Sequence, residues 1–443
     1  MSETELATVA ALTHEGEGVV RGGKTAFVAG ALPGETVRFR RVRRHRQHDE
    51  ARLIEVVHAA PERTVPRCAH FGVCGGCVLQ HLIPERQIEL KEAELRESLE
   101  RIGRVAPQEW LAPLRGPAWA YRRRARLGAR FVAKKGRVVV GFRERWTSHV
   151  ALIERCEVLA APAGELVGPL ASALTALSIR DRIPQIEVAV ADNVTALVLR
   201  VLTAPSSADL EILRRFESAH GLRLYLQPGG IESVQRLTPG DGEPLSYGLG
   251  QFGVRLEFEP TDFVQVNGAV NQALVARAVE LLEPDPTSRV LDLYCGIGNF
   301  SLALARQAAR VVGVEGEAGL VQRARHNATI NGLGNVEFEA ADLGQPPPPS
   351  SGWARERFSH VLLDPPRAGA RDVMPTIARL EPERLLYISC HPGSLARDVG
   401  MLVHDFGFAL CAAGVLDMFP HTTHVESLAL LMPVEGARGG QSR

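Results

Sequence analysis

The C-terminal half of the chain contains the stretch Leu385-Leu386-Tyr387-Ile388-Ser389-Cys390-His391-Pro392, around which the rest is organised. Four apolar or aromatic residues in succession predict a buried parallel strand. Cys390 follows at the carboxyl end of that strand, the edge where open α/β sheets bind their ligands. A single cysteine there is either packed in the core, as free cysteines commonly are, or a nucleophile. The neighbouring segments favour the nucleophile, because they predict a cofactor site at the same edge.

A glycine-containing turn lies upstream, within residues 289–300 (RVLDLYCGIGNF). This pattern predicts a strand, a tight turn and a helix, in which Gly296 and Gly298 let the backbone approach a ligand closely. A third glycine at dinucleotide spacing is missing, so the motif by itself is a weak signal.

Acidic residues stand at the ends of four successive predicted strands: Asp292, Glu315, Asp342 and Asp364. The position of Glu315 suits ribose hydroxyls, and that of Asp342 suits an adenine amino group. The glycine turn carries no basic residue, so these carboxylates disfavour a phosphate ligand and favour a cationic one. S-adenosylmethionine has a sulfonium and a ribose and no phosphate. Helix N-capping could explain any one of these acidic residues, but it is a weaker explanation for acids at the same position after four strands.

The first 58 residues predict a small β-barrel, with short strands at 8–14, 18–20, 24–28, 35–41 and 52–57 between glycine and proline turns. Six arginines fall within nine residues: Arg38, Arg40, Arg41, Arg43, Arg44 and Arg46. Such a density of guanidinium groups suits phosphate contacts, so we expect RNA binding rather than a merely solvated face.

Four cysteines of the next segment predict a metal site: Cys68, Cys74, Cys77 and Cys156. Four thiolates suit zinc or an iron–sulfur cluster equally by ligand type, and the spacing is not a ferredoxin pattern. Seven cysteines in 443 residues do not indicate a disulfide scaffold, so a reducing compartment is expected.

Between these cysteines, Pro84 to Arg104 predicts a helix with an apolar stripe. A basic segment, Tyr121 to Leu127, follows it, and a hairpin is expected to turn at Lys135-Gly136. Its aromatic neighbours, Phe142 and Trp146, suggest together with Tyr121 that bases of single-stranded RNA stack there. The alternative is a charged edge strand that prevents aggregation.

Composition limits the remaining classes. Formal net charge is zero, so nucleic-acid affinity must come from local patches. The acidic start, residues 1–5, lacks the features of an export signal, and no apolar run is long enough to span a bilayer. A cytoplasmic protein without membrane contact is therefore expected.

Several of these motifs together resemble those of the RNA uracil-C5 methyltransferase family: residues 292–300 (DLYCGIGNF), 364–367 (DPPR), 389–392 (SCHP), 424–426 (HVE) and 263–267 (FVQVN). The resemblance covers essentially the whole chain. A barrel similar to a TRAM domain and four cluster cysteines point to the subgroup that methylates large-subunit ribosomal RNA. In that subgroup the cysteines hold a [4Fe-4S] cluster, which favours this cluster over zinc.

The resemblance implies a role for each matching residue. Cys390 would add to C6 of uracil, which makes C5 nucleophilic, and Glu426 would then remove the C5 proton. A lowered pKa is expected for the Cys390 thiol. The cofactor pocket would be lined by Gln265, Tyr294, Gly296, Asn299, Glu315, Asp342 and Asp364, although Asp364 could instead contact the uracil. Two positions depart from the family pattern: His391 where asparagine is frequent, and Tyr294 where phenylalanine is common.

The expected protein has three domains, of α+β and α/β class: an OB-like TRAM barrel (1–58), an α+β middle domain with the iron–sulfur site (59–264), and a Rossmann-like S-adenosylmethionine-dependent methyltransferase domain (265–443). The expected reaction is methylation of C5 of one uridine in 23S rRNA by a monomer, with the target base flipped out of its stack. Alternatives are the same chemistry on tRNA, cytosine-C5 methylation of RNA, and an RNA-binding iron–sulfur protein without methyl transfer. A cytosine enzyme would place its nucleophile beside a Pro-Cys motif, which is absent here.

Overall fold

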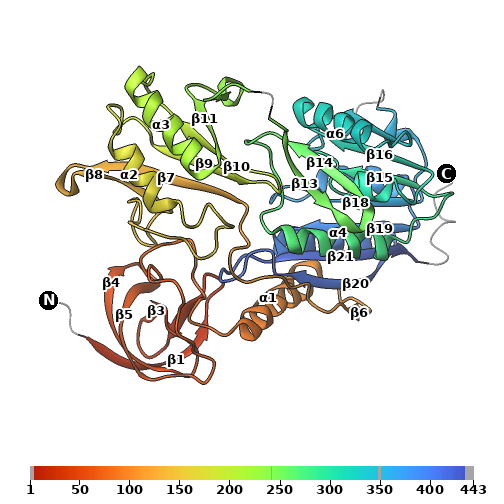
Figure 1. Ribbon diagram of the computed structural model, residues 1–443. Coiled ribbons are helices and arrows are strands. Elements are labelled where there is room, and N and C mark those ends of the chain that lie inside the picture. The colour runs from red at the N-terminus through yellow and green to blue at the C-terminus, as the bar shows by residue number, and fades with distance from the viewer. Residues whose placement is uncertain (1–3, 241, 348–350, 435–443) are drawn as a thin grey trace.

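The computed structural model describes residues 4–240, 242–347 and 351–434. Residues 1–3, on which part of the export-signal expectation depends, lie outside this range. Figure 1 shows three regions: a barrel at the lower left, a sheet at the upper left and a larger sheet at the right.

The barrel is closed in the order β1-β2-β3-β5-β4, because β1 pairs with both β2 and β4. Its strands are β1 (Glu5–Leu12), β2 (Glu17–Val20), β3 (Thr25–Ala29), β4 (Thr36–Arg44) and β5 (His48–His58). Alternate residues of β4, such as Val37 and Phe39, fill the core, and this alternation leaves Arg38 and Arg40 exposed. The predicted barrel is thus confirmed, with strand ends that differ by a few residues.

A six-stranded sheet of order β12-β11-β10-β9-β7-β8 follows. It consists of β7 (Arg124–Val132), β8 (Arg137–Gly141), β9 (Gln185–Val190), β10 (Thr195–Arg200), β11 (Arg223–Gln227) and β12 (Gln235–Arg236). The helices α2 (Val167–Thr175) and α3 (Ser207–His220) share its hydrophobic core. The predicted hairpin is confirmed, because β7 and β8 pair across a short turn that ends at Gly136.

The C-terminal sheet has eight strands in the order β17-β16-β15-β18-β19-β21-β20-β6. Its strands are β6 (Glu109–Trp110), β15 (Arg289–Leu293), β16 (Arg310–Glu315), β17 (Val336–Ala340), β18 (His360–Leu363), β19 (Arg384–Ser389), β20 (Phe408–Leu416) and β21 (Glu426–Pro433). The first five in this order are parallel, and β21 is antiparallel to both of its neighbours. The chain order reverses between β15 and β18, and sheets of this kind bind ligands at that reversal.

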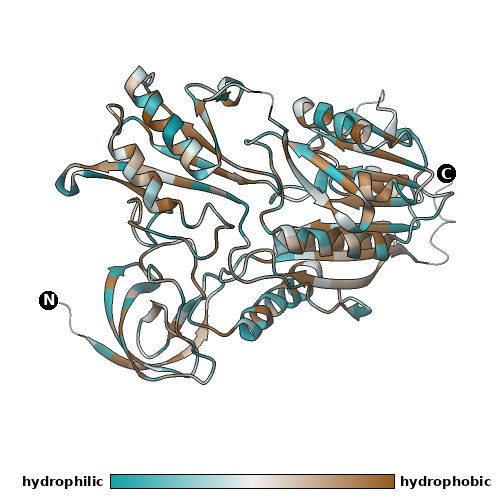
Figure 2. Cartoon of the chain, viewed as in Figure 1, coloured by the Kyte–Doolittle hydropathy of each residue, from teal (hydrophilic) through white to brown (hydrophobic). Residues whose placement is uncertain are grey.

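Helices cover both faces of this sheet: α1 (Pro84–Ser98), α4 (Gly268–Leu282), α5 (Ser301–Leu304), α6 (Ala318–Ile330), α7 (Met374–Arg379) and α8 (Pro392–Phe406). Successive side chains of β19 point to opposite faces of the sheet, so this strand contributes to the hydrophobic core on each face. Leu386 and Ile388 pack in the core that contains α4, whereas Leu385 and Tyr387 pack in the core that contains α8. Figure 2 shows the corresponding concentration of hydrophobic residues in these strands. A two-stranded hairpin, β13 (Leu245–Leu249) and β14 (Val254–Phe258), packs in the same core as α4.

The first helix differs from its prediction at its C-terminal end. After Ser98 the chain continues as a π-helical turn, Leu99–Gly103, and Ile102 is exposed rather than part of the apolar stripe. α1 packs against α8 and β20, so it lies beside the C-terminal sheet although it precedes that sheet by many residues (Figure 1). Across the described ranges, none of the helices combines the length and apolar character that a membrane crossing requires.

The remaining helical pieces are single 3₁₀ turns: Ala133–Lys135, Ile231–Ser233, Gly250–Phe252, Trp353–Arg355 and Arg371–Val373.

Candidate active site

The carboxyl ends of the parallel strands form one edge, and most of the predicted site residues lie on it. Strand register pairs Leu293 with both Val314 and Leu363, so the residues that follow these strands are neighbours. Tyr294, Glu315 and Asp364 therefore gather at the reversal point. Asp292 lies one layer lower, because it is fully buried within β15 and its carboxylate accepts a hydrogen bond from the Ser301 hydroxyl. Burial raises the pKa of Asp292 to about 7.

The glycine turn after β15 opens towards free space. Gly296 has a φ of +56°, and a Cβ atom built there would meet nothing within 4 Å. Its backbone N–H donates to Oε2 of Glu315 at 3.1 Å, so the turn and the end of β16 are fixed to each other. Tyr294 also adopts a positive φ, and its hydroxyl donates to the carbonyl of Leu343 at 3.2 Å. That bond ties the turn to the loop after β17, where Asp342 is exposed.

Asn299 is held by a side-chain network that the sequence did not indicate. Its Oδ1 accepts from the Tyr247 hydroxyl at 3.0 Å and from Nδ2 of Asn271 at 2.9 Å. Its own Nδ2 donates back to Oδ1 of Asn271 at 3.0 Å. Both lone pairs of the Asn299 carbonyl are thus occupied, and one N–H remains for a ligand.

Gln265 and Asp364 come together from segments 99 residues apart, because Nε2 of Gln265 donates to Oδ2 of Asp364 at 3.4 Å. Burial raises the pKa of Asp364 to about 7. A carboxyl with this pKa binds either a cation, as a carboxylate, or a carbonyl oxygen, as an acid. The geometry is therefore compatible with both of the roles considered for Asp364.

Cys390 and Glu426 lie at the same end of one strand pair. β19 and β21 pair up to Ser389 opposite Ser427, so Cys390, which follows β19, lies beside Glu426, the first residue of β21. Cys390 is exposed, whereas Glu426 retains 9% of its accessible surface. A thiol that solvent can reach and a buried carboxyl thus share one site.

Burial and neighbouring carboxyls raise the pKa values of both groups. Burial, and then the carboxylate of Asp364, raise the pKa of Glu426 to about 8, while the ammonium of Lys91 opposes the shift. Burial, followed by Glu426 and Asp364, raises the pKa of the Cys390 thiol to about 11, with Arg367 opposing. The expected lowering of the thiol pKa is therefore wrong for the protein without its ligands, because burial and two nearby carboxyls both disfavour the thiolate.

The turn after Cys390 explains one departure from the family pattern. His391 is the N-cap of α8, and its Nδ1 accepts a hydrogen bond from the backbone N–H of Ser394 at 3.1 Å. Asparagine caps helices through a side-chain oxygen in the same way. Desolvation lowers the pKa of His391, which keeps the ring neutral so that Nδ1 can accept. Histidine thus performs the capping role here.

A buried lysine lies near Glu426, and its role was not predicted from the sequence. Lys91 of α1 retains 1% of its surface, and its ammonium donates to Oδ1 of Asp417 at 2.7 Å and to the carbonyl of Phe419 at 3.0 Å. Its position four residues from the buried Leu95 places both on one helix face, which was the available signal. Lys91 therefore anchors the segment that leads from β20 to Glu426.

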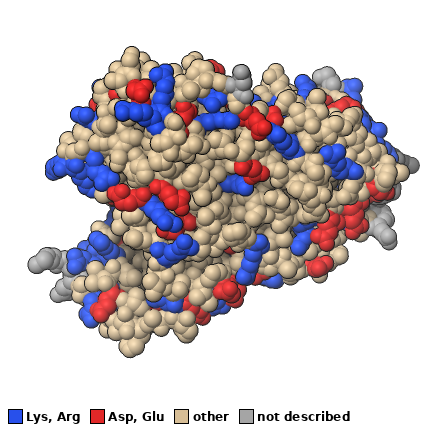
Figure 3. Space-filling view, in the orientation of Figure 1, with Lys and Arg blue, Asp and Glu red and all other residues tan. Residues whose placement is uncertain are grey.

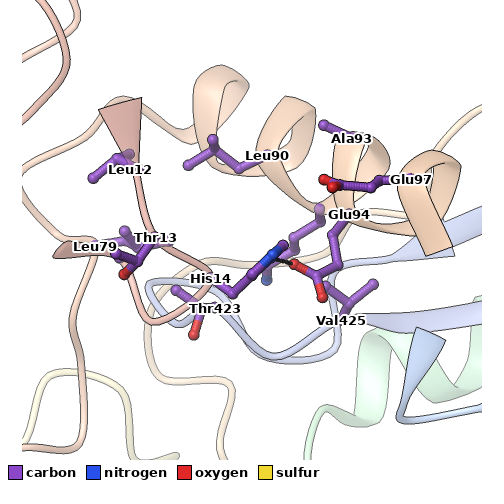
Figure 4. A pocket seen from close by; sticks show the side chains of 12 residues that line it. Leu12, Thr13, His14, Leu79, Leu90, Ala93, Glu94, Glu97, Thr423 and Val425 are labelled. Carbon is purple, nitrogen blue, oxygen red and sulfur yellow. Dashed lines mark hydrogen bonds and ion pairs between the residues drawn. The ribbon is translucent and has the colours of Figure 1, made fainter. Parts of the chain in front are cut away.

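The barrel and the cysteine loop support the same segment. A cavity of about 160 Å³ lies between the turn after β1, helix α1 and Thr423 to Val425, and Figure 4 shows the side chains that line it. His14 and Glu94 form an ion pair across it. The backbone N–H groups of Val78 and Leu79 both donate to the carbonyl of His421, at 2.9 and 3.0 Å. The N-terminal half of the chain thus holds the segment that carries Glu426.

The four predicted cluster cysteines line a single pocket: Cys68, Cys74, Cys77 and Cys156. Burial raises the pKa of the Cys77 thiol to about 12 and that of Cys74 to about 11. No set of three or more His, Cys, Asp or Glu side chains within the described ranges is arranged to hold a metal ion. Apart from Cys390, the other two thiols are consistent with the predicted core positions, because Cys295 is buried and Cys411 partly buried.

The second predicted basic surface is only partly available for stacking. Tyr121 is buried, with its hydroxyl donating to the carbonyl of Pro420 at 3.1 Å, so its predicted contact with a base is wrong. Trp146 is 41% exposed, as the prediction requires. On the barrel, Arg41 is bound by Glu5 and Asp49 rather than free for phosphate.

Comparison with known proteins identifies relatives over nearly the full length. The sequence matches the family described as tRNA (Uracil-5-)-methyltransferase over residues 252–343 and 353–434. It is 53% identical over 431 residues to the 23S rRNA (uracil(1939)-C(5))-methyltransferase RlmD of Nitrosococcus oceani, covering 97% of this chain and 96% of the relative. The protein of the same name from Alkalilimnicola ehrlichii is 51% identical over 428 residues, with 95% of each chain covered.

Among solved structures, the fold is similar to that of the Pyrococcus abyssi tRNA (uracil-54, C5)-methyltransferase in complex with S-adenosyl-L-homocysteine. The TM-score is 0.73 at 23% identity, with 97% of this chain and 100% of the other covered. At this identity the likeness establishes a shared fold.

Proposed function

The chain belongs to the RNA uracil-C5 methyltransferase family, and on this premise we propose that it methylates C5 of a uridine in 23S rRNA, giving 5-methyluridine, with S-adenosylmethionine as methyl donor. The observation that carries the proposal is the register of β19 and β21, which makes Cys390 and Glu426 direct neighbours at the edge where the parallel strands end. A nucleophile and a base are both needed, and each is useful only if the other is within reach of the same ring.

The proposed chemistry gives these residues successive tasks. The sulfur of Cys390 bonds to C6 of uracil, and the ring electrons shift so that C5 carries nucleophilic character. Bound S-adenosylmethionine supplies a methyl group on a positively charged sulfonium. After C5 has gained the methyl group, Glu426 takes the C5 proton, the C5=C6 double bond re-forms, and the sulfur of Cys390 leaves. The raised pKa of Glu426 makes it a stronger base than an ordinary carboxylate, which suits a proton on carbon.

We propose that the cofactor pocket is lined by Gln265, Tyr294, Gly296, Asn299, Glu315, Asp342 and Asp364. The open space beside Gly296, the fixed carboxylate of Glu315 and the exposed Asp342 support this assignment. A positive sulfonium among these acids would lower the pKa of Asp364 and Glu426 and of the Cys390 thiol, since a nearby cation favours every ionised form. Cofactor binding would thereby help to ionise the nucleophile.

A [4Fe-4S] cluster on Cys68, Cys74, Cys77 and Cys156 is proposed for the cysteine pocket. The four thiols line one pocket, yet no three of them are placed for a single ion. Four thiolates are the ligand set that a [4Fe-4S] cluster takes, and its role would be to join the loop of Cys68 to the distant Cys156.

The domain division accompanying this proposal is a TRAM-like barrel (1–58), a middle domain with the cluster (59–264) and a Rossmann-like catalytic domain (265–443). The protein would act as a monomer on a uridine flipped out of its stack. The strand order of the C-terminal sheet and the closed barrel support the two outer assignments.

The substrate assignment is tested by offering the purified protein two transcripts, a 23S rRNA fragment with the uridine that the relatives modify and a tRNA. Nucleoside analysis by mass spectrometry should find 5-methyluridine in the rRNA fragment and none with Cys390→Ala. Methylation of the tRNA alone would favour the tRNA enzyme suggested by the family name. Methylation of neither transcript under conditions that load cofactor and cluster would contradict the proposed function.

A further inference from the structure

A second cavity, of about 670 Å³, lies at the junction of the barrel and the cysteine loop, outside the proposed reaction site. The barrel contributes Arg52 and Val42, and the opposite wall comes from Phe71, His81 and Trp146. In Figure 3 the surface is indented between the barrel, at the lower left, and the chain above it, with basic side chains on both sides and acidic ones on the upper side. This volume is within the range of small-molecule sites, about 300–1,000 Å³.

His81 is an unusual wall residue. Its side chain retains 1% of its surface, and both ring nitrogens lack a hydrogen-bond partner among the described residues. Such orphaned polar atoms are rare in folded proteins, and a bound polar group commonly accounts for them. Its ring lies against Phe71, with centroids 5.3 Å apart. Burial, and then Arg63, lower the pKa of His81 to about 3, so the neutral ring offers one donor and one acceptor.

Trp146 supplies an exposed flat surface at the same cavity. Its ring is 41% exposed, and the guanidinium of Arg145 lies over it at 5.4 Å from the ring centroid. A guanidinium and an indole together form a platform on which a flat ring stacks favourably. Arg52 is exposed and forms no ion pair with any residue that the structure describes, so it remains available for a phosphate.

We propose that this cavity binds an unpaired nucleobase of the RNA substrate, one other than the methylated uridine. The base stacks on Trp146, its polar edge reaches His81, and Arg52 contacts the adjoining phosphate. Three features favour RNA over a protein segment: the flat aromatic platform, the neutral donor–acceptor ring and the exposed guanidinium of Arg52, although Glu144 also lines the cavity. This inference rests on the proposed RNA substrate and adds a recognition site distant in sequence from Cys390.

The test measures binding of the 23S rRNA fragment by fluorescence anisotropy, at one fixed salt concentration because phosphate contacts are salt-dependent. Trp146→Ala should weaken binding about 10- to 100-fold, the effect typical of one lost base–aromatic stack. Trp146→Phe should recover most of this affinity. Ile231→Ala, at an exposed apolar position (58%) on another surface, serves as the control and should bind as the wild type does.

An abasic scan of the fragment identifies the base itself. In the wild type, removing one base other than the target uridine should weaken binding strongly, and in Trp146→Ala the same removal should have little further effect. His81→Phe should reduce the same coupling. Equal binding by Trp146→Ala and wild type, or equal abasic sensitivity in both, would overturn the inference and leave the cavity to a protein partner or to no ligand.

The two proposals fail differently in this experiment. Methylation by the wild type with unaltered binding by Trp146→Ala would remove the second base site alone. Loss of binding and of abasic coupling in Trp146→Ala, without any methylation by the wild type, would keep the base site and remove the proposed reaction.

Discussion

Proton removal from C5 should depend on pH through Glu426. The pKa of this buried carboxyl is raised to about 8, and only its ionised form can accept the proton. With a pKa near 8, about a tenth of the groups are ionised at pH 7 and about nine tenths at pH 9. The rate of the proton-removal step should therefore rise about tenfold across this interval. By this step the cationic sulfonium has become a neutral thioether, so it no longer lowers the pKa of Glu426.

Tritium at C5 of the target uridine makes this step visible. In a single turnover, release of tritium to water reports proton removal, whereas labelled methyl groups report methyl transfer. Forming the methylated adduct at one pH and then changing the pH separates the step from ionisation of Cys390, whose thiol has a pKa of about 11. Glu426→Gln should slow tritium release about 10²- to 10⁴-fold and let the methylated adduct accumulate.

A flat pH dependence of tritium release between pH 7 and 9, or wild-type release by Glu426→Gln, would refute the assignment of the base.

The pH dependence of folding stability gives a check on the raised pKa of Glu426 that does not involve catalysis. A carboxyl whose pKa is raised in the folded state stabilises the fold below its ordinary pKa, and this contribution is lost as the pH rises through about 8. Wild type should therefore lose stability relative to Glu426→Gln between pH 4.5 and 8 in urea unfolding.

Three further changes test the supporting structure. Lys91→Met leaves the carboxylate of Asp417 without its buried partner and should lower the free energy of unfolding by about 3–5 kcal/mol. The double variant with Asp417→Asn should recover part of this loss, whereas equal urea midpoints for wild type and Lys91→Met would contradict a buried ion pair. Cys156→Ser should lose iron and visible absorbance after anaerobic purification, and unchanged iron content would exclude it as a ligand. Gly400→Ala places a Cβ 2.7 Å from the carbonyl oxygen of Gly103 and should cost about 1–3 kcal/mol in thermal unfolding, whereas an unchanged melting temperature would contradict the close packing of α8.

The elements of this fold were predictable where a local pattern dominates. The apolar run before Cys390 predicted β19, and the alternation and turns of the first 58 residues predicted the barrel. The position of acids after successive parallel strands also followed, because parallel strands end at one edge. Strand ends were less certain, since pairing with neighbours rather than sequence sets where a strand stops.

Features that depend on long-range packing could not be predicted in this way. The opposition of Cys390 and Glu426 requires β21 to insert between β19 and β20, a register that local sequence does not contain. Tyr121 was expected at a surface and is buried by Pro420, 299 residues away. The role of Lys91 likewise appears only when α1 packs beside the C-terminal sheet. The upward pKa shift of Cys390 arises from burial and then from the carboxyls of Glu426 and Asp364, all of which depend on tertiary structure.

The central claim is that the sulfur of Cys390 bonds to C6 of the target uracil, and 5-fluorouridine tests it most directly. A base can remove the hydrogen at C5 as a proton but cannot remove a fluorine in its place. RNA that carries 5-fluorouridine at the target position should therefore stop the reaction at the covalent adduct. Peptide mass spectrometry after incubation with S-adenosylmethionine should find a methylated fluorouridine nucleotide on Cys390, and none with Cys390→Ala. An adduct on another cysteine, or one that persists in Cys390→Ala, would contradict the account.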